Sequence, residues 1–247
     1  MLKYNLIYLD SVDSTNTYAL SLISKHEPPE GTIVYTYNQR QGKGMQGNKW
    51  QSETGSNLLF SVILYPVFLA SKNLFSLNQV IALAVCRSLE QLTMQRFKIK
   101  WPNDIMHEDD KVCGILVENT FRGMHLGACV AGIGINVNQL MFDAFSPKAV
   151  SLKNITGKHF NCEEVLQYFQ NSFDDLYKLL ISQKTSTINE MYHQYLFRKD
   201  TLHVFERNGT YFNATIKGVN DAGKLLIQQA DSVLEIIDVK EIKYIFN

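Results

Sequence analysis

Apolar positions in the first 198 residues recur with two different periods. Four segments carry them at helical spacing and predict amphipathic helices, the first of which begins in the polar run from Asp13 to Asn16. Near-continuous apolar runs between these segments predict buried strands. The predicted helices are 13–25, 76–92, 166–180 and 188–196, and the predicted strands are 33–37, 57–65, 97–101, 112–118 and 126–133. The polar stretches 39–50 and 103–110 are expected to form a long loop and a turn.

After residue 199 the pattern changes from helical to alternating. Turn sequences at Asn208-Gly209, at 221–223 and at Asp231-Ser232 separate short strand-like runs. Five strands are predicted there, at 203–206, 211–219, 224–228, 234–237 and 242–246. Five short strands in one compact segment indicate a small barrel. We therefore predict an α+β protein with one domain over residues 1–198 and a compact β domain over residues 199–247.

Composition and charge narrow the classes of function. The chain has 247 residues, 45% of them hydrophobic, and 24 Lys and Arg balance 24 Asp and Glu. A net charge of zero argues against a general binder of nucleic acids or anionic membranes. The most apolar segment, 58–70, is shorter than the ~20 residues that a membrane-spanning helix needs. Four scattered cysteines without a C-x-x-C pattern, and an N-terminus without a secretory signal, indicate a cytoplasmic protein with reduced thiols.

The segment from Gly42 to Trp50 is a first candidate for chemistry. It contains three glycines and two lysines, so backbone amides and ammonium groups could approach a phosphate. Its glycines match neither the P-loop nor the dinucleotide-binding pattern. A surface hairpin without a ligand explains the glycines equally well.

Two further segments carry charged or unusual residues at strand ends. Pro102 fixes a turn after a buried strand, and Asn103 and Asp104 follow it. Lys111 then begins an apolar strand, either as a solvated terminus or as a cation directed into a pocket. Alternate glycines in the segment 132–138 are costly in a strand unless a ligand or another backbone passes close by.

These segments, in this order and spacing, resemble the biotin–protein ligase family. The matching stretches are Asp-Ser-Thr-Asn at 13–16, the loop 42–50, Lys-Trp-Pro-Asn-Asp at 100–104, the strand 111–118 and Gly-Ile-Gly-Ile-Asn at 132–136. The resemblance implies a mixed central sheet with flanking helices, similar to class II synthetases, and a C-terminal SH3-like barrel. It also implies that biotin and MgATP form biotinyl-5′-AMP, from which biotin passes to a lysine of a biotin carboxyl carrier protein.

The resemblance assigns a role to individual residues. Lys111 would be the principal catalytic cation, and Lys43 would assist it where the family usually has arginine. The implied biotin-binding residues are Ser14, Thr15, Asn16, Gln39, Lys43, Gly44, Met45, Lys111, Gly114 and Leu116. The implied ATP-binding residues are Gly42, Trp50, Lys100, Asn103 and Asn136, and Asp104 would contact Mg²⁺.

Met45 departs from the family pattern, because a second arginine often stands there and methionine cannot pair with phosphate. The loop should still close over the adenylate, through Lys43, Lys49 and backbone amides. The chain starts at the catalytic domain, without the ~60 residues of a helix-turn-helix module, so no DNA binding is expected. An exposed strand edge would permit a homodimer, which the sequence does not decide.

Two alternatives use the same residues differently. A lipoate or octanoate ligase has related acyl-lysine chemistry but needs an elongated apolar slot instead of polar partners for a ureido ring. A non-catalytic biotin or nucleotide sensor would bind ligand without turnover. Lys111, Lys43 and Asp104 argue against the sensor, and the polar run Ser14 to Asn16 argues against the lipoate ligase.

Overall fold

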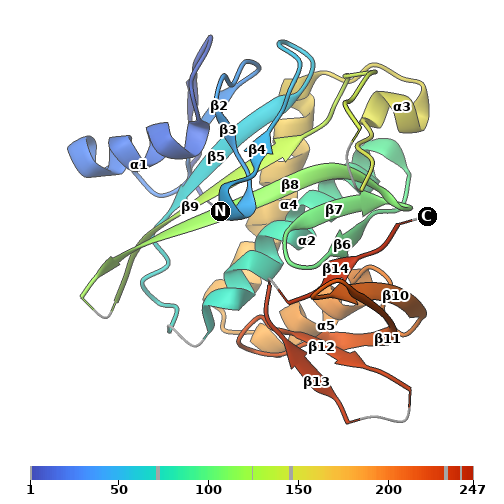
Figure 1. The fold of residues 1–247 in the computed structure, drawn as a ribbon. Helices are drawn as coiled ribbons and strands as arrows, with labels where there is room; N and C mark the ends of the chain where they lie inside the picture. Colours follow the sequence, from blue (N-terminus) through green and yellow to red (C-terminus); the bar gives the residue numbers. More distant parts are fainter. Residues whose placement is uncertain are drawn as a thin grey trace.

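A seven-stranded mixed sheet forms the centre of the molecule in the computed structural model, which describes residues 2–70, 73–123, 125–144, 147–230, 233–239 and 241–246 (Figure 1). The order of its strands is β1-β2-β5-β9-β8-β7-β6, and all neighbours pair antiparallel except β1 and β2. In that order the strands are Asn5–Tyr8, Thr32–Thr36, Leu58–Leu64, His125–Ile135, Asp110–Arg122, Asp104–His107 and Lys98–Lys100. The mixed sheet with flanking helices confirms the predicted fold class.

Helices cover the two faces of this sheet in different ways. The long helices α2 (Leu74–Thr93) and α4 (Cys162–Ile181) pack together over one face in the main hydrophobic core. Helix α1 (Thr15–His26) covers the other face through a separate small cluster around Ala19, Val34 and Ile63. Helices α3 (Leu152–Thr156) and α5 (Thr185–Tyr195) complete the α elements.

The C-terminal segment forms a five-stranded antiparallel sheet below the central one (Figure 1). Its order is β13-β12-β11-β10-β14. From β10 to β14 the strands are Leu202–Arg207, Thr210–Val219, Leu225–Gln228, Glu235–Ile237 and Lys243–Tyr244. The five predicted strands are therefore all present, with bounds shifted by a few residues. The turn predicted at Asp231-Ser232 lies outside the described residues.

Two segments that were expected to be irregular contain strands. The predicted turn 103–110 includes β7, because Ile105 and Met106 are fully buried and pair with β8. The predicted loop 39–50 is a hairpin of β3 (Gly42–Lys43) and β4 (Lys49–Trp50) around a short 3-10 turn, Met45–Gly47. The turn prediction was wrong, because polar residues outnumber the two buried apolar residues in that segment. The hairpin matches the alternative given above for the segment from Gly42 to Trp50.

Other differences concern short or marginal elements. Strand β1 and helix α3 were not predicted, since β1 is mostly exposed and α3 has only five residues. Helix α1 begins at Thr15, since the hydroxyl of Ser14 accepts a hydrogen bond from Thr17 N at 3.4 Å and caps the helix. In the described ranges, no helix combines the length and the apolar content that crossing a membrane requires.

Candidate active site

A cavity of about 380 Å³ lies where both sheets, the N-terminus of α1 and the β3-β4 hairpin meet. This volume suits a small organic ligand. It is lined by most of the predicted site residues, namely Ser14, Thr15, Asn16, Gln39, Lys43, Gly44, Met45, Trp50, Lys100, Asn103, Asp104, Lys111, Gly114 and Leu116. Two predicted ATP contacts, Gly42 and Asn136, are not among its lining residues.

One end of the cavity is uncharged and consists of Ser14, Thr15, Asn16 and Gln39, which we call the uncharged end. The backbone N and the Oγ1 of Thr15 both donate to Gln39 Oε1, at 2.9 and 3.2 Å. The Nδ2 of Asn16 donates to the backbone oxygen of Leu116 at 3.1 Å and to Glu118 Oε2 at 2.8 Å. These bonds fix the direction of each side-chain amide before any ligand arrives.

Ser61 supports the uncharged end from strand β5, and the sequence analysis did not identify it. Its side chain is fully buried in β5, with Oγ 2.8 Å from Thr15 Oγ1 and 2.6 Å from Asn16 Oδ1. Gly132 leaves room for this arrangement, because a Cβ there would lie 2.2 Å from Asn16 Oδ1. The available signal was a single hydroxyl in an otherwise apolar, completely buried strand.

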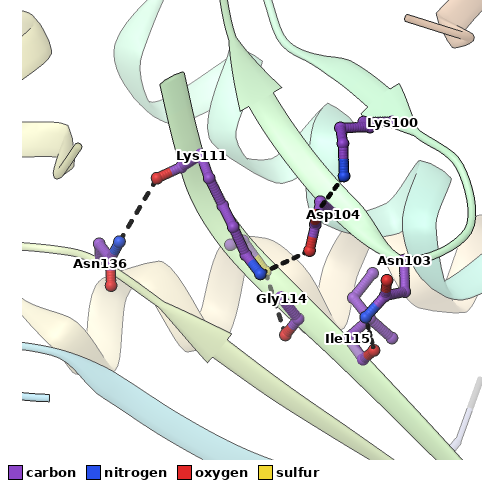
Figure 2. A network of polar contacts seen from close by, with 8 residues as sticks. Lys100, Asn103, Asp104, Lys111, Gly114, Ile115 and Asn136 are labelled. Atoms are coloured by element: carbon purple, nitrogen blue, oxygen red, sulfur yellow. Dashed lines mark hydrogen bonds and ion pairs between the residues drawn. The ribbon is translucent and has the colours of Figure 1, made fainter. Parts of the chain in front are cut away.

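The opposite end, which we call the lysine end, consists of Lys100, Asp104 and Lys111 (Figure 2). Asp104 Oδ2 lies 2.8 Å from Lys100 Nζ, and Asp104 Oδ1 lies 2.5 Å from Lys111 Nζ. Burial of the Asp104 carboxyl raises its pKa. The charges and hydrogen bonds of Lys100 and then Lys111 lower this pKa, and together they outweigh the effect of burial. The net pKa of Asp104 is lowered, so the carboxylate is ionised and holds both ammonium groups.

The strands of the lysine end are tied together by two asparagine side chains. Asn103 Nδ2 donates to the backbone oxygen of Ile115 at 2.9 Å, which links the turn before β7 to β8 (Figure 2). Asn136 is buried, and its Nδ2 donates to the backbone oxygens of Val150 at 3.2 Å and Lys111 at 3.5 Å. Asn136 thus braces the backbone that carries Lys111 and lies behind the cavity wall. The ATP contact predicted for Asn136 stays a prediction.

Trp50 covers a floor of glycines inside the cavity. A Cβ at Gly114 would lie 2.8 Å from the indole ring, and one at Gly134 would lie 2.6 Å from it. The ammonium of Lys111 lies 5.4 Å from the centroid of the Trp50 ring, within range of a cation–π contact. The Nε1 of Trp50 is buried and has no hydrogen-bond partner among the described residues. This N–H is therefore a donor that an acceptor on a ligand could satisfy.

Gly42 has a structural reason that the sequence did not show. A Cβ at this position would lie 2.4 Å from the backbone oxygen of Trp50 and 2.6 Å from Gln39 Nε2. The hairpin can therefore close against Trp50 only with glycine here. Lys43, Gly44 and Met45, which follow it, do line the cavity.

Cations dominate the charge of the lining. The described lining residues include five lysines and a single carboxylate, and the lysines are Lys43, Lys49, Lys100, Lys111 and Lys243. Such a surface favours a ligand with several negative charges. Lys243 and the neighbouring Val239, Ile242 and Tyr244 belong to the C-terminal segment and were not predicted, since only the packing of the two sheets brings them here.

The residues present do not fit a magnesium ion held by the protein alone. Both oxygens of Asp104 are already paired with lysines. Within the described ranges, no group of three His, Cys, Asp or Glu side chains could hold a metal. The arrangement therefore favours Asp104 as the partner of two lysines, and Mg²⁺ would enter on the phosphates of ATP.

Comparisons with known proteins agree with this site. The model of the family described as "Biotin/lipoate A/B protein ligase family" matches residues 8–136. The bifunctional ligase/repressor BirA of Bacillus subtilis is 30% identical over 236 residues, covering 94% of this chain and 72% of that protein. The biotin–[acetyl-CoA-carboxylase] ligase of Paracoccus denitrificans is 30% identical over 229 residues, covering 89% of this chain and 92% of that protein.

A solved structure shares the whole architecture. The biotin protein ligase from Aquifex aeolicus, in complex with biotin and ATP, superposes with a TM-score of 0.81 at 28% identity and covers 97% of both chains. These similarities confirm the family, the fold and the ligase class predicted from the sequence. The chain belongs to the biotin/lipoate A/B protein ligase family, and the proteins from Paracoccus denitrificans and Aquifex aeolicus named above are biotin ligases.

Proposed function

We propose that this chain is a biotin–protein ligase that converts biotin and MgATP into biotinyl-5′-AMP and pyrophosphate. It then transfers the biotinyl group to a lysine of a biotin carboxyl carrier protein. The observation that carries the proposal is one cavity whose uncharged end offers fixed hydrogen-bonding groups and whose other end holds paired lysines. Biotin has the same division, with a neutral ureido ring at one end and a carboxylate at the other.

In the first step the biotin carboxylate attacks the α-phosphorus of ATP, and pyrophosphate leaves. Both reactants are anionic, so cations must offset their repulsion and the charge that develops. Each lysine ammonium has three donors and gives one to Asp104, which leaves donors on Lys100 and Lys111 for phosphate and carboxylate oxygens. We assign Lys111 to the reacting carboxylate and α-phosphate, and Lys100 and Lys43 to neighbouring phosphate oxygens.

In the second step a neutral lysine amine of the carrier attacks the carbonyl carbon of the mixed anhydride. The new amide bond forms, AMP leaves with the electron pair of the broken C–O bond, and the amine loses a proton. Lys111 would stabilise the departing phosphate oxygen as it does in the first step. The hairpin residues Lys43 to Met45 would shield the adenylate from water until the carrier arrives.

The uncharged end supports biotin over lipoate as the substrate. A ureido ring has two N–H donors and one carbonyl acceptor, which the side chains of Ser14, Thr15, Asn16 and Gln39 can match. The dithiolane ring of lipoate and the tail of octanoate have no comparable groups, and a polar pocket left unmatched is penalised. The family includes ligases for biotin and for lipoate, and the polar residues of the uncharged end favour biotin.

We also propose that residues 1–198 and 199–247 are two domains. The last helix of the first segment ends at Tyr195 and the C-terminal sheet begins at Leu202, which supports this division. The cytoplasmic location, the absence of DNA binding and a homodimer stay predictions from the sequence.

Intact-mass measurement of a biotin carboxyl carrier domain, incubated with the protein, biotin and MgATP, tests the proposal. We expect the carrier to gain one biotinyl group, and pyrophosphate to form even when the carrier is omitted. A lipoyl carrier domain with lipoate or octanoate is the parallel reaction. If only the lipoyl carrier domain is modified, the substrate is lipoate or octanoate, and the assignment of biotin is wrong. Ligand binding without pyrophosphate would identify a sensor instead of an enzyme.

A further inference from the structure

We propose that Tyr244, in the C-terminal sheet, is a positioning residue for the adenylation step. Its aromatic ring holds the ammonium of Lys100 and, through Lys100 and Asp104, sets the position of Lys111. The inference rests on the proposed function and assigns a part in it to a residue far from every motif that identified the family.

The contacts form a continuous series from the C-terminal sheet to the catalytic cation. Lys100 Nζ lies 5.1 Å from the centroid of the Tyr244 ring, within the ~6 Å range of a cation–π interaction. The same ammonium donates to Asp104 Oδ2 at 2.8 Å, and Asp104 Oδ1 pairs with Lys111. The side chain of Lys100 is only 12% exposed, so water screens these contacts weakly.

The Tyr244 ring is itself held in place. Strand β14 pairs with β10 so that Tyr244 lies opposite Phe205, and the two rings meet edge to face with centroids 5.2 Å apart. Phe197 packs nearby, with its centroid 6.4 Å from that of Tyr244. A ring fixed on two sides can fix a flexible lysine, whose four-carbon stem would otherwise sample several rotamers.

The ring face, and not the hydroxyl, makes the contact that matters. The Oη of Tyr244 is buried and has no hydrogen-bond partner among the described residues. The electron-rich face of the ring, in contrast, lies beside a buried ammonium. The inference therefore predicts that phenylalanine works at this position and that an aliphatic residue does not.

Loss of this contact should not detach the C-terminal sheet, because other contacts also hold it. Trp101 Nε1 donates to the backbone oxygen of Gly223 at 2.8 Å. The guanidinium of Arg198 contacts the rings of Phe197 and Phe246, 4.9 and 4.7 Å from their centroids, and donates to the backbone oxygen of Ile245. Substitution of Tyr244 can therefore be tested in the folded, full-length chain.

The experiment measures pyrophosphate release with biotin and MgATP for Tyr244→Phe, Tyr244→Leu and a series with fluorinated phenylalanines at position 244. Fluorine keeps the shape of the ring but weakens its negative face. We expect Tyr244→Phe to match the wild type, and the rate to fall with each added fluorine. Tyr244→Leu should be about three- to thirtyfold slower, the range of a partly buried cation–π contact. The KM for biotin should change less than kcat, because the uncharged end, which holds the ureido ring, is untouched.

Two controls separate positioning from packing. Phe212 is a matched aromatic residue in the same sheet, 5.3 Å from the guanidinium of Arg207 and outside the cavity lining, so Phe212→Leu should leave adenylation unchanged. In a Lys100→Met background the fluorination series should become flat, because the ring would have no cation to hold. Unfolding temperatures of all variants are measured in parallel.

Two results would overturn the inference while leaving the proposed function intact. One is a flat fluorination series in an active wild-type background, which would show that the ring only fills space. The other is a loss in Tyr244→Phe as large as in Tyr244→Leu, which would assign the effect to the hydroxyl. A wild-type protein that released no pyrophosphate would instead overturn the proposed function and this inference with it.

Discussion

The uncharged end and the lysine end of the cavity are built on different physical principles. At the uncharged end, the side chains of Thr15, Asn16 and Gln39 are already held by short hydrogen bonds within the protein, one of them to the carboxylate of Glu118. At the lysine end, one carboxylate holds two ammonium groups whose remaining donors are available to a ligand. The first arrangement selects a shape and a pattern of donors, and the second supplies charge. We infer that substrate choice and reaction rate depend on separate groups of residues.

The largest expected effect comes from removing Lys111, the cation of the lysine end that we assign to the reacting carboxylate and α-phosphate. Lys111→Ala should slow formation of biotinyl-adenylate by about 10²- to 10³-fold, the usual loss when one fixed electrostatic group is removed from a reacting centre. Rapid-quench measurement of pyrophosphate checks this. Lys178→Ala, on an exposed helix surface, is the matched control and should behave as the wild type. A biotin Kd that weakened as much as the rate would contradict the separation of the two ends.

Asp104→Asn should destabilise the fold, because Lys100 and Lys111 would lose their shared partner. Loss of one member of a buried ion pair costs about 3 kcal/mol of unfolding free energy. Since the pKa of Asp104 is lowered from 3.8, its contribution is present at neutral pH and is lost as pH falls through the lowered value. Urea unfolding should therefore show a gap between variant and wild type that narrows below about pH 4.

The exposed pair of Asp175 with Lys178 provides the control for that measurement. Asp175→Asn should change the unfolding free energy by less than about 1 kcal/mol, as exposed ion pairs do. Equal losses in the two variants would show that burial does not strengthen the lysine end.

Ser61→Ala tests the uncharged end. The change leaves Asn16 Oδ1 and Thr15 Oγ1 without their buried partner, at a cost of about 1–2 kcal/mol. Biotin should bind about tenfold more weakly by calorimetry, while the Kd of ATP should stay the same. Ser88→Ala is a matched control, because Ser88 is also fully buried but its hydroxyl donates only to the backbone oxygen of Val85. A parallel loss of ATP affinity in Ser61→Ala would show that the two ends are coupled.

The smallest effect should arise at the junction with the C-terminal sheet, outside both ends. His193 Nε2 accepts a hydrogen bond from Val219 N at 2.9 Å, and burial lowers the pKa of this imidazole despite opposing contributions. A lowered pKa means that the unfolded chain binds the proton more tightly, so stability is complete above pH 6.5 and declines below it. Thermal unfolding of His193→Gln should be less sensitive to pH between about 5 and 7 than the wild type. An unchanged profile would remove His193 as the cause.

Sequence patterns located the groups that stand together in motifs, and they missed those that depend on packing. Asp104 and Lys111 could be predicted because a strand end and the start of the next strand lie close in the chain. Ser61 could not, because a single serine in a buried strand has no neighbour in sequence to mark it. Tyr244 comes to the cavity only through the docking of one sheet against another.

Motif membership also does not show which neighbours each residue contacts. Asn136 and Gly42 belong to matching segments, yet Asn136 braces the backbone of Lys111 and Gly42 allows the hairpin to close on Trp50. Residues of both kinds occur within a few positions of each other, so a linear pattern cannot tell them apart. Burial and hydrogen-bond partners make the distinction.

The placement of the two tryptophans gives the molecule a pair of built-in optical reporters. Trp50 lies in the cavity with its ring near the ammonium of Lys111, and its indole N–H has no hydrogen-bond partner in the part of the chain that the structure describes, so its emission should respond to a ligand. Trp101 is buried and bonded to Gly223 of the C-terminal sheet, so its emission should respond when the two sheets separate. Trp50→Phe and Trp101→Phe would leave one reporter each. Occupancy of the cavity and opening of the junction could then be followed as two separate light signals in real time.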